Sequence, residues 1–248
     1  MRNARNRVIK MAVWEIRYNT RLTFFDRAGS LMQRFLDWEG RRFFPRWSYS
    51  VDGIELSNPE TFTKFTVGVK RASAAADNLL PIEDYGRFSE KALEFFHQTV
   101  QDLGLEALGR VGHRLAYLVP TDETFEAFAQ ALTSQLTRLP QLADNIEACR
   151  AEDVSAVWIS KHEGTSFRWA VGPLALEEFP GRFAAHELPP EANKEERRFY
   201  PAVSLLVEVD AFRTGQVPAA ELDGFWRDGY DYIDQQVLKL THALQEKS

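Results

Sequence analysis

The strongest constraint on the fold is a long amphipathic segment near the end of the chain, Pro218–Glu246. Its apolar residues recur at helical spacing, so one stripe of the predicted helix must be buried. This stripe consists of Leu222, Phe225, Trp226, Tyr230, Ile233, Val237, Leu240 and Leu244. Shortly before it, Val203–Asp210 (VSLLVEVD) is apolar enough for a central strand. We therefore predict a sheet that packs against one long helix.

The residues before this strand supply the other elements of the second half. The sequence Thr121–Thr124 (TDET) is a capping box and predicts a helix that follows it. Val154–Lys161 and Ser166–Val171 alternate as two strands joined by a turn. Residues 172–200 are rich in Pro, Glu and Gly and predict an irregular loop. The second half is therefore expected to run helix, three strands, helix.

Strand and helix patterns also alternate in the first half. Alternating apolar residues predict a strand, and apolar residues at every third or fourth position predict a helix. The predicted elements are a strand at Val8–Asn19, a helix at Ala28–Trp38, strands at Phe43–Val51 and Phe62–Lys70, a helix at Tyr85–Leu103 and a strand at Leu108–Val119. Asp52-Gly53 predicts a hairpin turn. The order β-α-β-β-α-β is that of a ferredoxin-like sandwich.

The predicted fold class is therefore α+β. It consists of a ferredoxin-like half over residues 1–120, followed by an antiparallel sheet with a long C-terminal helix over residues 121–248. A length of 248 residues suffices for one large domain or two modest ones. We expect the two halves to share one core. Hydrophobic residues at 44% and charged residues at 27% exclude a disordered or fibrous chain.

Charge is distributed unevenly along the chain. Residues 1–50 contain eleven Lys and Arg against four Asp and Glu, a charge of +7, which leaves −13 for the rest of a chain whose net charge is −6. Such a basic segment can bind nucleic acid, or it can dock on the acidic body or on a second subunit. Docking is favoured, because so short a segment releases few counterions unless the fold gathers it on one face. The candidate nucleic-acid residues are Arg34, Arg41, Arg42 and Arg46.

The sequence lacks the motifs of common catalytic and cofactor chemistries. It has no GxxxxGK[ST] phosphate loop, no GxGxxG after a strand, no HExxH and no GxSxG. The five histidines are not at metal-ligand spacing, and the single cysteine, Cys149, excludes an intrachain disulfide. We therefore expect no metal and no cofactor, and the balance leans against an enzyme.

The densest polar cluster lies on the predicted strand Leu108–Val119. Alternation places Arg110 and Arg114 on one face beside Gly112, and His113 on the opposite, more apolar face. The two arginines can hold a phosphate or carboxylate, or they can form ion pairs with acids of the sheet. Arg110, His113 and Arg114 are thus the candidate ligand-binding residues, with a core position favoured for His113.

Glu208 and Asp210 form a second candidate pair, since residues two apart on a strand face the same side. Paired carboxylates can bind a metal or perform acid–base chemistry. Alternatively, Asp210 ends the strand and organises a turn at Phe212–Gly215, which is the favoured interpretation.

Two segments carry a resemblance to a known family. The sequence LGRVGHRLAYLVP (Leu108–Pro120) has an Arg-x-Gly-x-Arg core, and SLLVEVDAF (Ser204–Phe212) precedes the long helix. In both, the chain resembles a sporadically distributed family of uncharacterised prokaryotic proteins of similar length. The resemblance implies no catalytic residues, because none is established for that family. The patchy distribution of the family resembles that of mobile, defence-associated or toxin–antitoxin genes.

These observations favour a non-enzymatic binding or regulatory protein of a bacterial accessory system. It would act through protein–protein contacts, as a homodimer or with a partner protein. Two alternatives remain open: a nucleic-acid-binding protein that uses the basic N-terminal 50 residues, and a sensor or hydrolase for a nucleotide or another small molecule that uses Arg110, Arg114, His113, Glu208 or Asp210. A cytoplasmic location away from membranes is expected, because the chain has no long apolar run and no apolar secretory signal at its start.

Overall fold

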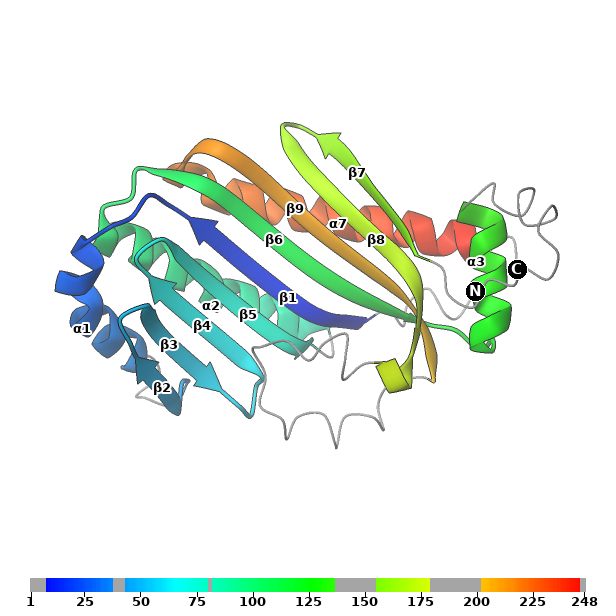
Figure 1. The fold of residues 1–248 in the computed structure, drawn as a ribbon, viewed down its shortest axis with the longest axis horizontal. Helices are drawn as coiled ribbons and strands as arrows, with labels where there is room; N and C mark the ends of the chain where they lie inside the picture. Colours follow the sequence, from blue (N-terminus) through cyan, green and yellow to red (C-terminus); the bar gives the residue numbers. More distant parts are fainter. Residues whose placement is uncertain (1–7, 38–42, 80–81, 137–154, 179–201, 246–248) are drawn as a thin grey trace.

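Nine strands form one antiparallel sheet in the computed structural model, which describes residues 8–37, 43–79, 82–136, 155–178 and 202–245. The elements are β1 (Val8–Arg17), α1 (Thr23–Leu36), β2 (Arg46–Tyr49), β3 (Gly53–Asn58), β4 (Thr63–Gly68), β5 (Arg71–Leu79), α2 (Ile82–Leu103), β6 (Ala107–Pro120), α3 (Phe125–Leu136), β7 (Ala156–His162), β8 (Thr165–Ala175), β9 (Val203–Pro218) and α7 (Leu222–Gln245), with short 3₁₀ helices at Leu176–Glu178 and Ala219–Glu221. The strand order is β2-β3-β4-β5-β1-β6-β9-β8-β7 (Figure 1).

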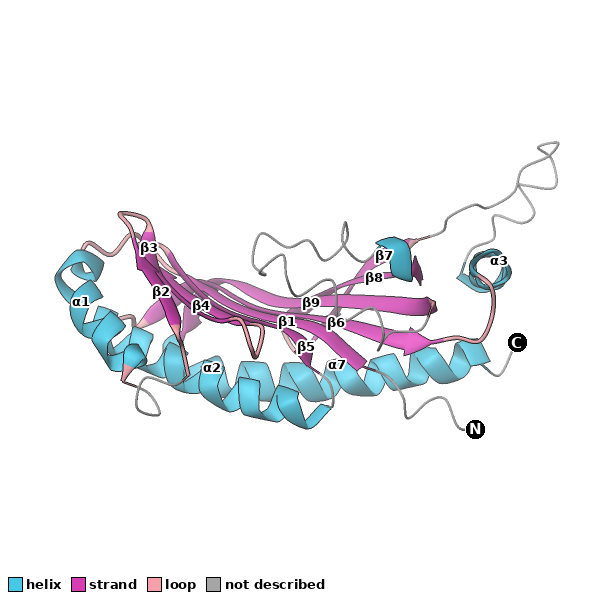
Figure 2. Cartoon of the chain, turned by 90° about the horizontal axis from the view of Figure 1, so that it is seen from below, coloured by secondary structure: helices cyan, strands magenta, loops and turns pink. Residues whose placement is uncertain are grey.

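The helices α1, α2 and α7 all lie on one face of this sheet (Figure 2). The predicted α+β class, with an antiparallel sheet and a long C-terminal helix, is therefore confirmed. None of the described helices is both long enough and apolar enough to cross a membrane.

The two halves of the sheet repeat one order of elements. From β1 to α2 the chain runs strand, helix, four strands, helix, and from β6 to α7 it runs strand, helix, three strands, helix among the described residues. Outward from the centre, one half reads β1-β5-β4-β3-β2 and the other β6-β9-β8-β7. The first strands of the two halves, β1 and β6, are antiparallel neighbours at the centre of the sheet. The sequence itself shows no corresponding repeat.

The predicted ferredoxin-like half is not confirmed. Four strands, β2 to β5, lie between α1 and α2, where the sequence pattern predicts two. The expected turn forms, with the Ser50 N–H donating to the Gly53 carbonyl at 2.9 Å, but the next strand begins at Gly53 itself. The alanine-rich segment Arg71–Leu79 adds the fourth strand, β5, which pairs with β1 and β4.

The predicted loop over residues 172–200 is only partly described. Residues 172–175 belong to β8 and residues 176–178 to a 3₁₀ helix, whereas residues 179–201 lie outside the described residues. Cys149 also lies outside them.

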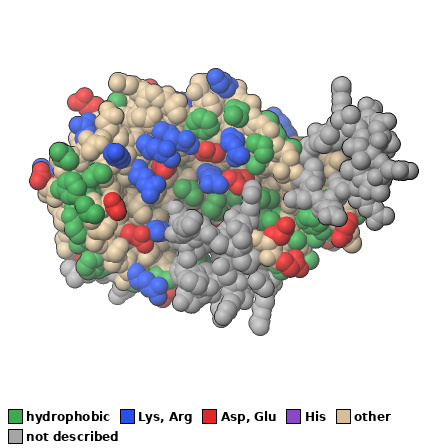
Figure 3. Space-filling view, viewed as in Figure 1, with side chains coloured by type: hydrophobic (Ala, Val, Ile, Leu, Met, Phe, Trp, Pro, Cys, Tyr) green, Lys and Arg blue, Asp and Glu red, His purple; other side chains and the backbone are tan. Residues whose placement is uncertain are grey.

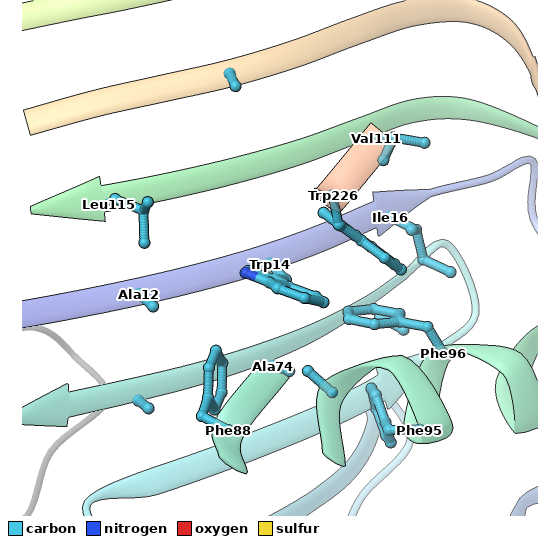
Figure 4. Close-up of a cluster of buried hydrophobic side chains, with 14 of the residues drawn as sticks. Ala12, Trp14, Ile16, Ala74, Phe88, Phe95, Phe96, Val111, Leu115 and Trp226 are labelled. Atoms are coloured by element: carbon cyan, nitrogen blue, oxygen red, sulfur yellow. The ribbon is translucent and has the colours of Figure 1, made fainter. Parts of the chain in front are cut away.

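Aromatic side chains join the helices to the centre of the sheet. Trp14 of β1 stacks on Trp226 of α7, with ring centroids 4.7 Å apart and an interplanar angle of 18°. Phe96 of α2 also contacts Trp226, with centroids 4.7 Å apart, and Phe88 lies edge-on to Trp14 (Figure 4). Residues from both halves of the chain thus belong to one continuous core.

Candidate functional site

The face of the sheet opposite to α1, α2 and α7, called here the open face, carries polar residues over the middle of the sheet, whereas toward one end of β6, β8 and β9 it carries a buried apolar cluster of Ala116, Leu118, Leu174 and Leu206. Figure 2 shows that this face is concave, because the sheet bends away from the helices at β2–β3 and at β7–β8. In β6, Val111, His113 and Leu115 point toward the helices and are buried. The intervening Arg110 and Arg114 therefore lie on the open face, as the alternation predicts.

Three arginines stand side by side across the centre of the open face. Arg17 of β1 is the register partner of Arg71 in β5 on one side and of Arg110 in β6 on the other. Like charges directly opposite each other on neighbouring strands are destabilising. The stability of the fold therefore does not explain this arginine row, defined as Arg71, Arg17 and Arg110.

A carboxylate of β1 partly compensates the charge of the row. Glu15 Oε1 lies 2.6 Å from Arg17 Nε and 4.0 Å from Arg110 Nε. The Glu15 side chain is 18% exposed, whereas that of Arg17 is 55% exposed. The acid therefore lies beneath the guanidinium, which remains turned toward solvent.

The same layering recurs between β6 and β9. Arg114 Nε donates to Glu208 Oε1 at 2.8 Å, and Arg110 Nη2 donates to Asp210 Oδ2 at 3.0 Å. The Glu208 side chain is 8% exposed and that of Arg114 is 48% exposed. Arg114 therefore faces outward over Glu208, whereas Arg110 and Asp210 are equally exposed, each at 26%.

The Arg110 guanidinium lies beside Gly112. A Cβ at Gly112 would meet Arg110 Nε at 3.4 Å, which is a van der Waals contact that the flexible arginine side chain can accommodate. The guanidinium also lies over the ring of Phe212, with its central carbon 4.8 Å from the ring centroid.

Further cations lie around the arginine row. The register of the described strands places these cations on the open face: Arg17, Arg46, Lys64, Arg71, Arg110, Arg114, Lys161 and Arg168. It places five acids on the same face, Glu15, Glu55, Asp77, Glu208 and Asp210, of which Asp77 is buried against Lys10 Nζ at 2.9 Å. Figure 3 shows Lys and Arg side chains gathered over the middle of this face. A chain with a net charge of −6 thus concentrates positive charge on one concave surface.

The structure does not bring His113 together with the two arginines. His113 lies on the helix side of β6 and is fully buried, with its Nε2 atom 2.9 Å from the Tyr85 hydroxyl. Burial lowers the pKa of His113 to about 3, so the ring is neutral near pH 7. His113 is therefore a core residue in this fold.

Glu208 and Asp210 share the open face, but the expected turn after Asp210 is wrong. The strand β9 continues to Pro218, because β6 pairs with it along this stretch, with Gly112 opposite Phe212. Burial raises the pKa of Asp210, and the Arg110 guanidinium opposes that shift. No cluster of three or more His, Cys, Asp or Glu residues that could hold a metal ion occurs in the described part of the chain.

Among the described residues, Arg34 and Arg46 of the basic N-terminal segment lie apart. Arg34 of α1 forms an ion pair with Asp102 of α2 at 3.2 Å, on the helix side of the sheet. Arg46 lies on the edge strand β2, and Arg41 and Arg42 lie outside the described residues. The sequence analysis missed Arg17, Arg71 and Arg168. Each occupies a polar position of its strand, but only the pairing of strands reveals that they share one face.

Comparison with models of known protein families and with curated proteins gave no match. The fold and the open face together define an α+β protein with a concave, positively charged sheet surface.

Proposed function

We propose that the protein is a non-enzymatic nucleic-acid-binding protein whose open face contacts the phosphate backbone of a duplex. The observation that carries this proposal is the arginine row, in which Arg71, Arg17 and Arg110 occupy adjacent register positions. A bound polyanion removes the unfavourable interaction among like charges that the free protein carries. The row is therefore better suited to the bound state than to the free state.

The chemistry of the face matches phosphate. A guanidinium presents a planar fork of donors that binds phosphate oxygens in pairs, and it keeps its charge at all physiological pH values. Ion pairs with Glu15 and Asp210 orient Arg17 and Arg110, whose side chains are 55% and 26% exposed, so these donors are positioned before binding.

A duplex fits this face better than a single strand does. Proteins that bind single strands stack the bases on aromatic side chains. Among the described strands, the register places one aromatic residue on the open face, Phe212, and Arg110 covers its ring. Nine strands spaced by about 4.8 Å span roughly 38 Å, close to one turn of B-DNA at about 34 Å.

The test measures binding of a fluorescent duplex of about 20 base pairs, two helical turns, by anisotropy between about 50 and 200 mM salt. The variant is Arg71→Ala. The ion pairs of the row that the structure describes involve Arg17 and Arg110, so this change leaves none of their acids without its cation. We expect weaker binding that is uniform across sequences, and a salt slope smaller by about one. The matched control is Arg227→Ala, an exposed arginine on α7, which should bind as the unaltered protein does.

Absence of binding at the lowest salt concentration would refute the proposal. Equal losses in Arg71→Ala and Arg227→Ala would show non-specific attraction and would also refute it. Tighter binding of a single strand than of the duplex would contradict the choice of the duplex.

A further inference from the structure

Among the described strands, β7 forms one edge of the sheet and pairs with β8 alone. An edge strand presents a row of backbone N–H and C=O groups to which another strand can add. Proteins usually protect such an edge with charged residues, proline or a bulge. The β7 sequence AVWISKH has one lysine and no proline, and it pairs with β8 in an uninterrupted register.

Three consecutive apolar residues of β7 are exposed. Val157 is 54% exposed, Trp158 is 38% exposed and Ile159 is 64% exposed. Successive side chains of a strand point to opposite faces, so apolar surface is exposed on both faces of this edge. The opposite edge, β2, is shorter and begins with Arg46, although it also exposes Trp47 and Tyr49.

The edge is also rigidly held before any partner binds. The rings of Trp158 and Trp169 stack with an interplanar angle of 7°, and Trp169 Nε1 donates to Ser160 Oγ at 3.0 Å. A preorganised strand loses less conformational freedom on binding than a flexible one does.

The sequence of β7 permits pairing with a second copy of itself without a clash of charges. Antiparallel pairing centred on Ile159 would place Val157 opposite Lys161 and Trp158 opposite Ser160 of the other strand. Ile159 would meet its own copy, and no charge would face a like charge. Two-fold pairing of this kind is the commonest symmetry of soluble oligomers.

We propose that β7 pairs with β7 of a second copy of this chain. The two nine-stranded sheets then form one continuous antiparallel sheet, and the exposed side chains of Val157, Trp158 and Ile159 become buried between the copies. Residues opposite each other in an antiparallel pair share a face, so the open faces of the two copies adjoin. This inference is independent of nucleic-acid binding, because it rests on β7 alone.

The test is the mass in solution, measured by size-exclusion chromatography with light scattering over a range of protein concentrations. The unaltered protein is expected at twice the 28.5 kDa of the single chain. Ile159→Lys and Ile159→Glu should each raise the dissociation constant by at least about tenfold, because each puts like charges opposite one another at the two-fold axis. The matched control is Val51→Lys, an exposed apolar residue in the turn between β2 and β3, which should remain dimeric.

Mixing the two Ile159 variants distinguishes β7 pairing from a general loss of stability. Lysine from one copy then meets glutamate from the other, so the mixture is expected to form dimers that neither variant forms alone. Circular dichroism of each variant checks that the exposed substitution leaves the fold intact. A monomeric unaltered protein, a dimer that survives Ile159→Lys, or a mixture that stays monomeric would each overturn the proposal.

Discussion

Replacing His113 with glutamine should flatten the dependence of stability on pH below neutrality. The His113 ring is fully buried between β6 and the helices, and burial lowers its pKa from 6.5 to about 3. The unfolded chain takes up a proton near pH 6.5, whereas the folded chain does so only near pH 3. The unfolded state therefore binds more protons between these values, and the free energy of unfolding falls as the pH falls.

The size of this effect follows from the shift in pKa. One unit corresponds to about 1.4 kcal/mol, so the whole shift corresponds to about 5 kcal/mol at pH 3. Between pH 7 and pH 5, where the unfolded histidine becomes mostly protonated, the loss is about 2 kcal/mol. His113→Gln keeps a polar group near Nε2 for the Tyr85 hydroxyl but has no proton to gain.

The assay is urea unfolding of both proteins at pH 7 and at pH 5, followed by tryptophan fluorescence. Other titrating groups are common to both proteins, so they cancel when the two pH differences are subtracted. The control His97→Gln removes a surface ion pair to Asp223 and should alter the pH difference by less than about 1 kcal/mol. If the unaltered protein and His113→Gln lose the same stability between the two pH values, the link between burial of His113 and stability is refuted.

Two further substitutions test the core and the buried ion pair between Lys10 and Asp77. Trp226→Ala removes the ring stacked on Trp14 and should lower the free energy of unfolding by about 3–5 kcal/mol, measured by urea unfolding with circular dichroism. Lys10→Met should cost about 3–5 kcal/mol, because it deprives the buried Asp77 carboxylate of an ammonium group 2.9 Å away. Adding Asp77→Asn to Lys10→Met should recover part of that loss, and a double variant less stable than Lys10→Met alone would contradict this explanation.

Elements with a strong local period could be predicted from the sequence. The helix expected at Tyr85–Leu103 is observed at Ile82–Leu103, and the strand expected at Leu108–Val119 is observed at Ala107–Pro120. In the first segment apolar residues recur at the period of a helix, and in the second at the period of a strand. Such a pattern predicts the element without information on what packs beside it.

The strand β5 could not be predicted in this way. Ala72, Ala74 and Ala76 are buried and face the helices, but alanine has a low preference for strands. β5 follows β4 after a two-residue turn, but its other partner, β1, ends at Arg17, more than 50 residues before Arg71, so local sequence does not show that this segment is a strand between them.

The arginine row could not be predicted for a related reason. Alternation assigns Arg110 to a face of its own strand, but it does not say which strands lie beside it. Only the register of β5, β1 and β6 places Arg71 and Arg17 next to Arg110. The same limit applied to Asp210 and Glu208, whose partners Arg110 and Arg114 lie about 100 residues earlier in the chain.

The central position of β1 has a consequence for synthesis on the ribosome. This strand emerges first, yet it pairs with β5 on one side and with β6 on the other. About 40 residues separate the end of β5 from the end of β6. At a translation rate of 5–20 residues per second, the edge of β1 that pairs with β6 therefore stays unpaired for roughly 2–8 s after β5 has emerged. During that interval a nascent chain can pair with another at this edge. Slower translation of residues 80–120 would lengthen the interval and should therefore reduce the yield of correctly folded protein.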